Sequence, residues 1–181
     1  MPQRRPLTPW VGALPYALIA AGALLRIVPH PANFAPIGAI ALFGGGVLPL
    51  PWSAVVSLAA VALADAVLGY YPGMAWVYGS FVLIALLGAV ALRRRRTVLR
   101  IACTSFAASA LFFVVTNFGE WLGPLYPHTL PGLRADYIAA IPFFRNTALS
   151  DLGYSLALFG LYEGALRAAG RRAAYPRSLA P

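Results

Sequence analysis

Two aspartates stand within apolar stretches of this chain, where a charge is costly. Asp65 lies near the end of the third apolar stretch and Asp151 near the start of the last. A carboxylate inside a membrane span costs roughly 2.5–3.5 kcal/mol on insertion scales, so it must face protein or water. Each aspartate has two explanations. It belongs to a structural ion pair or helix cap, for instance Asp151 with Arg145 or Arg26, or it forms the polar floor of a binding site.

Amide and aromatic side chains accompany the two aspartates. Asparagines beside the loops offer hydrogen-bond donors and acceptors, and aromatic rings could stack on a ligand. Any single aromatic has an alternative role in the belt at a membrane interface, where Tyr and Trp gather. The candidate binding residues are Asn33, Phe34, Asp65, Tyr71, Trp76, Tyr78, Asn117, Trp121, Arg145 and Asp151.

The residue types needed for catalysis are poorly placed. A cysteine nucleophile needs a base within hydrogen-bond reach, but Cys103 belongs to the inner part of the fifth apolar stretch, whereas His30 and His128 lie in outer loops. The chain has no lysine for Schiff-base chemistry, and Ser80 lacks a GxSxG context. Two histidines without a nearby cysteine make a weak metal site. We therefore expect no enzymatic activity, no metal and no cofactor.

The composition is that of a membrane protein. Hydrophobic residues make up 60% and charged residues 10% of the 181 residues, with a mean hydropathy of +0.74, whereas soluble domains are about half apolar and about a quarter charged. A helix needs about 20 apolar residues to cross a bilayer core of roughly 30 Å. We expect one domain, 1–181, that is an all-α integral membrane bundle of six transmembrane helices: 9–28, 36–50, 52–70, 75–92, 98–118 and 147–168.

The arginines predict the orientation of this bundle. With six spans and the N-terminus inside, eleven of the fourteen arginines fall on the cytoplasmic side, including the run 93–96, and only Arg26, Arg134 and Arg145 fall outside. Cytoplasmic loops collect arginine, so both termini are expected inside, in a multi-pass protein of the bacterial inner membrane. The net charge of +9 then favours contact with lipid headgroups, and we expect no nucleic-acid partner.

The outward connections are longer than the inward ones. Three prolines shape the first outward loop, and the third runs over some 28 residues, from Asn117 to Asn146. Long loops on one face are typical of a ligand site that opens outward. We also expect Glu163 to pair with Arg167 four residues on. The first span could be read as a signal peptide, but its length favours retention.

Small residues in the first span indicate a partner helix. Ala13, Ala17 and Ala21 recur every four residues, a spacing that lets another membrane helix pack closely. The alternatives are internal packing or chance, because alanine is abundant in this chain.

Several motifs carry a family resemblance. These are the string 33–44 (NFAPIGAIALFG), Asp65 to Gly69, Tyr78 to Phe81, Thr116 to Gly119, and 140–147 followed by Asp151. Together they resemble a bacterial membrane family that is itself similar to the substrate-capture (S) components of energy-coupling factor (ECF) transporters. This resemblance implies a six-helix bundle that binds a vitamin from outside and docks through its first helix onto a transmembrane subunit driven by ATPases.

Two functions from different classes remain open. The first is capture of a small vitamin-class molecule from the periplasmic side, a cobalamin-like ligand being one candidate, although the inner position of Cys103 disfavours a cobalt ligand. The second is a structural or assembly protein that binds another protein through its outward loops. A channel-like facilitator is a third reading, which the apolar inner halves of the spans disfavour.

Overall fold

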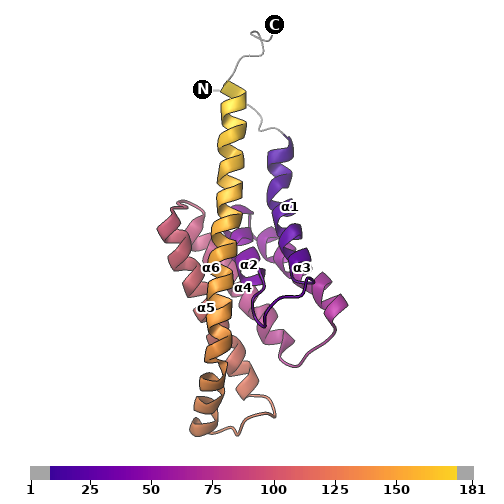
Figure 1. Cartoon of the computed structure of the whole chain (residues 1–181), viewed down its shortest axis with the longest axis vertical. Helices are drawn as coiled ribbons and strands as arrows, with labels where there is room; N and C mark the ends of the chain where they lie inside the picture. The colour runs from indigo at the N-terminus through magenta and orange to yellow at the C-terminus, as the bar shows by residue number, and fades with distance from the viewer. Residues whose placement is uncertain (1–8, 175–181) are drawn as a thin grey trace.

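The chain folds into six α-helices in a computed structural model that describes residues 9–174 (Figure 1). This confirms the all-α prediction, and no strand occurs in that range. Three arginines of the charge count, Arg4, Arg5 and Arg177, lie outside it. The helices are α1 (Pro9–Leu25), α2 (Ile37–Val47), α3 (Trp52–Leu68), α4 (Met74–Leu92), α5 (Val98–Trp121) and α6 (Leu130–Ala174).

Helix α2 is the centre of the bundle. Every residue from Ile37 to Gly46 is buried. Glycines allow its backbone to approach that of α4 closely, since a β-carbon on Gly45 would come 2.7 Å from the carbonyl carbon of Ala85, and one on Gly88 would overlap the carbonyl oxygen of Leu42. Helices that are apolar on all sides are held together mainly by such close packing.

Aromatic contacts join α2 to its neighbours and define the core. Phe43 packs edge-on against Phe159 of α6, with 5.1 Å between ring centroids. Phe81 of α4 stacks on Phe112 of α5 at 5.5 Å and an interplanar angle of 24°. Such pairs add about 0.5–1.5 kcal/mol each beyond the area they bury. The rings thereby fix the positions of α4, α5 and α6 around α2.

The last helix begins earlier than the sequence predicts. The third outward loop was expected to reach Asn146, but the non-helical link is only 122–129, and α6 then runs for 45 residues from Leu130. The hydroxyl of Thr129 accepts a hydrogen bond from the amide of Gly132 at 3.3 Å. A threonine at this position and Pro131 in the first turn are ordinary helix-start signals. The prediction of a 28-residue loop is therefore wrong.

Two helices, α4 and α5, are long and apolar enough to cross a membrane. The apolar helices α1, α2 and α3 are shorter, and α2 has only 11 residues. At 1.5 Å per residue it extends about 16 Å, roughly half of a bilayer core. Of the six predicted spans, two therefore have the length and composition of a helix that could cross a membrane.

The arginine run between α4 and α5 caps the end of α2. Arg93 donates to the carbonyl oxygen of Leu48 at 2.6 Å, and Arg96 donates to that of Gly46 at 2.9 Å. The carbonyl groups at a helix C-terminus lack intrahelical partners and carry partial negative charge, so cations stabilise them. Arg96 also forms an ion pair with Glu163 at 2.9 Å. The expected pairing of Glu163 with Arg167 is therefore wrong.

Candidate ligand-binding site

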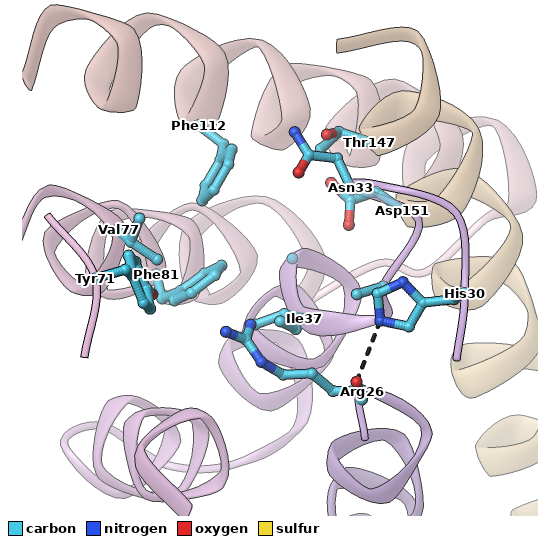
Figure 2. A pocket seen from close by; sticks show the side chains of 12 residues that line it. Arg26, His30, Asn33, Ile37, Tyr71, Val77, Phe81, Phe112, Thr147 and Asp151 are labelled. Carbon is cyan, nitrogen blue, oxygen red and sulfur yellow. Dashed lines mark hydrogen bonds between the residues drawn. The ribbon is translucent and has the colours of Figure 1, made fainter. Parts of the chain in front are cut away.

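A cavity of about 280 Å³ lies among the α1–α2 loop, the first turn of α2, the α3–α4 loop, α4, α5 and α6 (Figure 2). Ligand sites ordinarily measure about 300 to 1,000 Å³, so this cavity suits a compact molecule. Aromatic and aliphatic side chains form much of its wall, and five residues can offer polar side-chain atoms besides Tyr71. These are Arg26, His30, Asn33, Thr147 and Asp151.

Asp151 of α6 lies at the floor of the cavity, against the N-terminus of α2. The residue is 2% exposed. Its Oδ2 accepts a hydrogen bond from the Ser109 hydroxyl at 2.7 Å, and the backbone amide of Ala39 also donates to the carboxylate. Pro36, which precedes α2, provides no side-chain cap. Asp151 therefore caps α2 from another helix, where the partial positive charge of the first turn favours an anion.

Asp65 of α3 holds Arg26 at the cavity wall through an ion pair. The hydroxyl groups of Tyr78 and Tyr71 donate to its second carboxylate oxygen, at 2.9 Å and 3.3 Å. Burial first, and then the charge of Asp65, raise the pKa of Tyr71, so this phenol stays protonated and remains a donor. The Nε of Arg26 is buried and has no hydrogen-bond partner among the described residues. It is a buried donor behind the cavity wall, although other atoms of Arg26 line the cavity.

The α1–α2 loop is fixed to α6 by side-chain hydrogen bonds. Asn146 donates to the carbonyl oxygen of Ala32 at 2.9 Å, and Ser150 donates to that of Ala35 at the same distance. Between these two tethers Asn33 has a φ of 57°, in the left-handed region that asparagine tolerates better than most residues. The tethers hold this loop over the cavity.

His30 closes the same loop on itself. Its Nε2 lies 3.1 Å from the carbonyl oxygen of Arg26, the contact drawn in Figure 2, and its Nδ1 lies 3.0 Å from that of Pro31. A carbonyl oxygen can only accept, so a neutral imidazole, with one N–H, satisfies one of these contacts, and an imidazolium satisfies both.

Three predicted site residues, Asn33, Tyr71 and Asp151, line the cavity. Asp65 and Tyr78 lie directly behind Arg26 and do not line it.

Five other predicted site residues lie elsewhere. Phe34 packs edge-on against Tyr154 at 6.3 Å. Asn117 donates to the carbonyl oxygen of Phe113 in its own helix at 2.7 Å, and Trp121 donates to that of Pro127 at 3.0 Å. Trp76 borders a separate, shallow pocket where the start of α4 meets the end of α5, and Arg145 is exposed.

The cavity also includes residues that the sequence analysis did not place in a site. Arg26 entered that analysis only as a possible ion-pair partner. The sequence did indicate that Arg26 is unusual, since it is one of three arginines expected on the side of the membrane that positive charges avoid. The other lining residues carry no comparable signal in the sequence. They are His30, Ala35, Ile37, Gly38, Val77, Phe81, Phe112 and Thr147.

Two acidic residues, Glu120 and Asp136, lie outside the cavity, where α5 meets α6. Asp136 is 3% exposed, and its Oδ2 has no partner in the part of the chain that the structure covers. Burial first, and then the charge of Glu120, raise the pKa of Asp136 above its ordinary value. Residues 9–174 contain no group of three side chains suited to a metal ion.

Fold and cavity together define an all-α bundle that has two candidate membrane helices and a small cavity under its loops. The chain belongs to a family described as a family of unknown function (DUF6580), whose model matches residues 10–174. No curated protein matches the chain, and no solved structure does.

Proposed function

We propose that this protein resides in the bacterial inner membrane and captures a small molecule from the periplasmic side in the cavity above Asp151. The observation that carries the proposal is the buried carboxylate of Asp151, which has no counterion among the described residues, at a small and partly aromatic cavity. The Nε of Arg26 is a buried donor without a partner, and Asp151 is a buried carboxylate without a cation among the described residues. Buried charges are normally paired, so a ligand is a reasonable partner for the carboxylate of Asp151. The protein catalyses no reaction in this proposal.

The membrane location is supported by apolar side chains on the outside of the bundle. Val90 of α4 is 82% exposed and Leu63 of α3 is 72% exposed. Further exposed apolar side chains lie on several helices: Leu24, Val67, Leu99, Phe106, Val114, Leu149 and Leu161. An apolar surface of this extent suits lipid better than water.

Six spans with both termini inside agree with the arrangement in Figure 1. The start of α1, the end of α6 and the α4–α5 link with its arginine run lie toward one end of the bundle, and the α1–α2, α3–α4 and α5–α6 connections lie toward the other. This is the separation that the positive-inside rule requires. The short helices, α2 above all, then lie within the bundle without crossing the bilayer alone.

The best-fitting mode of action is that of a substrate-capture subunit of an ECF-type uptake system. Its support is the architecture: six helices, a cavity under the outward connections, and an exposed small-residue surface on α1 formed by Ala13, Ala17 and Ala21. That surface could meet a transmembrane subunit of an ATPase-driven module. The volume favours a compact vitamin-class ligand over a cobalamin-like one.

An assembly protein is the alternative, and one observation favours it. Exposed apolar side chains occur at the outer ends of the helices, where Tyr70 is 84% and Leu130 81% exposed. Exposed apolar surface outside lipid is typical of protein interfaces.

Extraction of bound molecules from the purified protein distinguishes the capture function from the assembly function. We expect mass spectrometry of the detergent-solubilised protein to detect a small molecule in near-stoichiometric amount. Ala35→Phe should abolish its retention by filling the cavity, whereas Ala66→Phe, on the exposed face of α3, should not. A protein partner bound stably in place of any small molecule would contradict capture and support assembly.

A further inference from the structure

The charges around the cavity are not balanced. The guanidinium group of Arg26 is compensated by Asp65, the carboxylate of which also accepts from two tyrosines. Asp151 has no such counterion, because the ion pairs in the described range are Arg26–Asp65 and Arg96–Glu163. The groups that donate hydrogen bonds to Asp151 are neutral. They are the hydroxyl of Ser109 and the backbone amide of Ala39.

The side of the cavity around Asp151 is rich in acceptors. Figure 2 shows Asn33 and Thr147 beside Asp151. The Thr147 hydroxyl donates to the carbonyl oxygen of Phe143 at 3.1 Å, so its lone pairs are left to accept. The Asn33 amide can present its oxygen. Three side chains can therefore accept N–H donors from one ligand group.

The opposite side of the cavity is apolar and aromatic. In Figure 2, Phe81, Phe112 and Val77 lie across the cavity from Asp151. The stacked pair of Phe81 and Phe112 presents ring surface to the space between. A flat apolar group packs well on such a wall.

We propose that the ligand is a small organic cation, with an amine- or amidine-type group that donates to Asp151, Asn33 and Thr147 and a flat apolar part that packs against Phe81 and Phe112. The inference rests on the proposed capture function and narrows its ligand class. A carboxylate only accepts, and charge-assisted N–H bonds to it are about twice as strong as neutral ones. An anion in the same place would be repelled by Asp151.

The role of Asp151 as a helix cap is compatible with this proposal. The first turn of α2 provides about half a unit of positive charge, which stabilises the carboxylate in the absence of a cation. This is about half the charge of an ionised carboxylate, so Asp151 in its ionised form retains a net attraction for a cation. The capping position therefore explains how a buried carboxylate without a basic partner persists in the fold.

Three probes of nearly equal shape test the ligand class on the full-length protein in detergent at neutral pH. Benzamidine is a flat cation, benzamide its neutral analogue and benzoate its anionic analogue. We expect isothermal titration calorimetry to show benzamidine binding at least about tenfold more tightly than benzamide, which is about 1.4 kcal/mol, and benzoate binding most weakly. This ranking needs no variant.

The variant Asp151→Asn then tests whether Asp151 causes the preference for a cation. Asparagine has nearly the same shape and still accepts a hydrogen bond, so benzamidine and benzamide should bind within about twofold of each other. The matched control is Glu120→Gln, which removes one negative charge outside the cavity and should leave the tenfold preference unchanged.

The outcomes separate this inference from the proposed function. Equal binding of the three probes, tightest binding of benzoate, or a cation preference that persists in Asp151→Asn overturns the cationic ligand, and capture then stands if extraction yields a retained molecule. If no probe binds and extraction yields no small molecule, both the inference and the capture function are overturned. A last case is that no probe binds but extraction yields a retained molecule. If that molecule is neutral or anionic, the inference is overturned. If it is a cation and its retention is lost in Asp151→Asn, the inference is supported.

Discussion

The carboxylate of Asp151 occupies the space where a side chain on Gly38 would begin. A β-carbon on Gly38 would come 2.6 Å from Oδ2 of Asp151, closer than real contacts allow. The absence of a side chain at position 38 lets α6 approach the first turn of α2, and the approach brings the carboxylate to the amides of that turn. One glycine thereby couples the cap of the central helix to the floor of the cavity.

Gly38→Ala should therefore disturb both stability and binding. Overpacking a buried contact costs about 1–3 kcal/mol, and the displaced carboxylate should weaken benzamidine binding at the same time. Thermal unfolding in detergent and calorimetry measure the two effects. Gly153→Ala is the control, since nothing lies within 4 Å of its β-carbon position and helical Gly→Ala stabilises by roughly 0.5–1 kcal/mol. Equal behaviour of both variants would show that the Gly38–Asp151 contact has no role.

The Arg26–Asp65 ion pair gives a second prediction. Asp65→Asn leaves the guanidinium without its counterion, and breaking a buried pair costs roughly 3–5 kcal/mol. Adding Arg26→Gln should recover part of this loss, with a coupling energy of about 0.5–3 kcal/mol in a double-mutant cycle. Melting temperatures of the three variants in detergent provide the measurement.

Arg145→Gln is the matched control for that cycle, because Arg145 is exposed and forms no ion pair within residues 9–174. It should change stability by less than about 0.5 kcal/mol. If Asp65→Asn lowers ligand affinity and leaves stability unchanged, Asp65 acts as a binding residue and not as the support of Arg26.

Helix boundaries were predictable from the sequence where hydropathy changes sharply. The spans expected at 75–92 and 98–118 correspond to α4 (Met74–Leu92) and α5 (Val98–Trp121), because the arginine run separates them. The start of α6 was not predictable in this way. The residues before the expected span at 147 are mixed in polarity, and the helical signal of Thr129 and Pro131 is local, with no change in hydropathy.

Site residues were harder to predict than helices, because hydropathy does not fix the rotation of a helix whose core and outer faces are both apolar. Asn117 and Asp151 have the same sequence signal, a polar residue in an apolar helix. Asp151 reaches the cavity, whereas Asn117 hydrogen-bonds to Phe113 in its own helix. Only tertiary packing distinguishes the two.

The acidic pair of Asp136 and Glu120 predicts a pH dependence of stability. Asp136 lies outside the proposed span 147–168, and its pKa is raised above 3.8 by burial and by Glu120. The folded protein then binds more protons than the unfolded chain between the two pKa values of Asp136, so this group makes stability fall as pH rises through that window. Glu120→Gln removes the like charge and should raise stability at neutral pH by roughly 0.2–1 kcal/mol.

Melting temperatures of wild type and Glu120→Gln between pH 4 and pH 8 test this prediction. The difference should shrink at the acidic end, where Asp136, whose pKa is raised, becomes protonated and no longer repels Glu120. A difference that stays constant with pH would show that Glu120 acts through packing and not through its charge.

The orientation can be tested with reporter fusions. Reporters fused after Arg96 and after Pro181 should give cytoplasmic signals, and one fused after Arg134 should give a periplasmic signal, because eleven of fourteen arginines then lie inside. A periplasmic signal from the reporter after Arg96 would contradict this topology, since the arginine run that caps α2 would then lie outside.

The exposed surface of α1 gives the last prediction, which rests on the uptake function. Ala13, Ala17 and Ala21 are all exposed, so they are available to lipid or to a partner and do not form the internal packing that the spacing also allowed. Ala17→Leu should leave the melting temperature and benzamidine binding of the isolated protein unchanged, because the added atoms point away from the bundle. It should reduce uptake of the captured molecule into cells, because close helix packing needs small side chains at the contact. Ala66→Leu on the exposed face of α3 adds the same volume elsewhere and should leave uptake unchanged. Equal uptake by both variants would mean that this surface of α1 faces lipid.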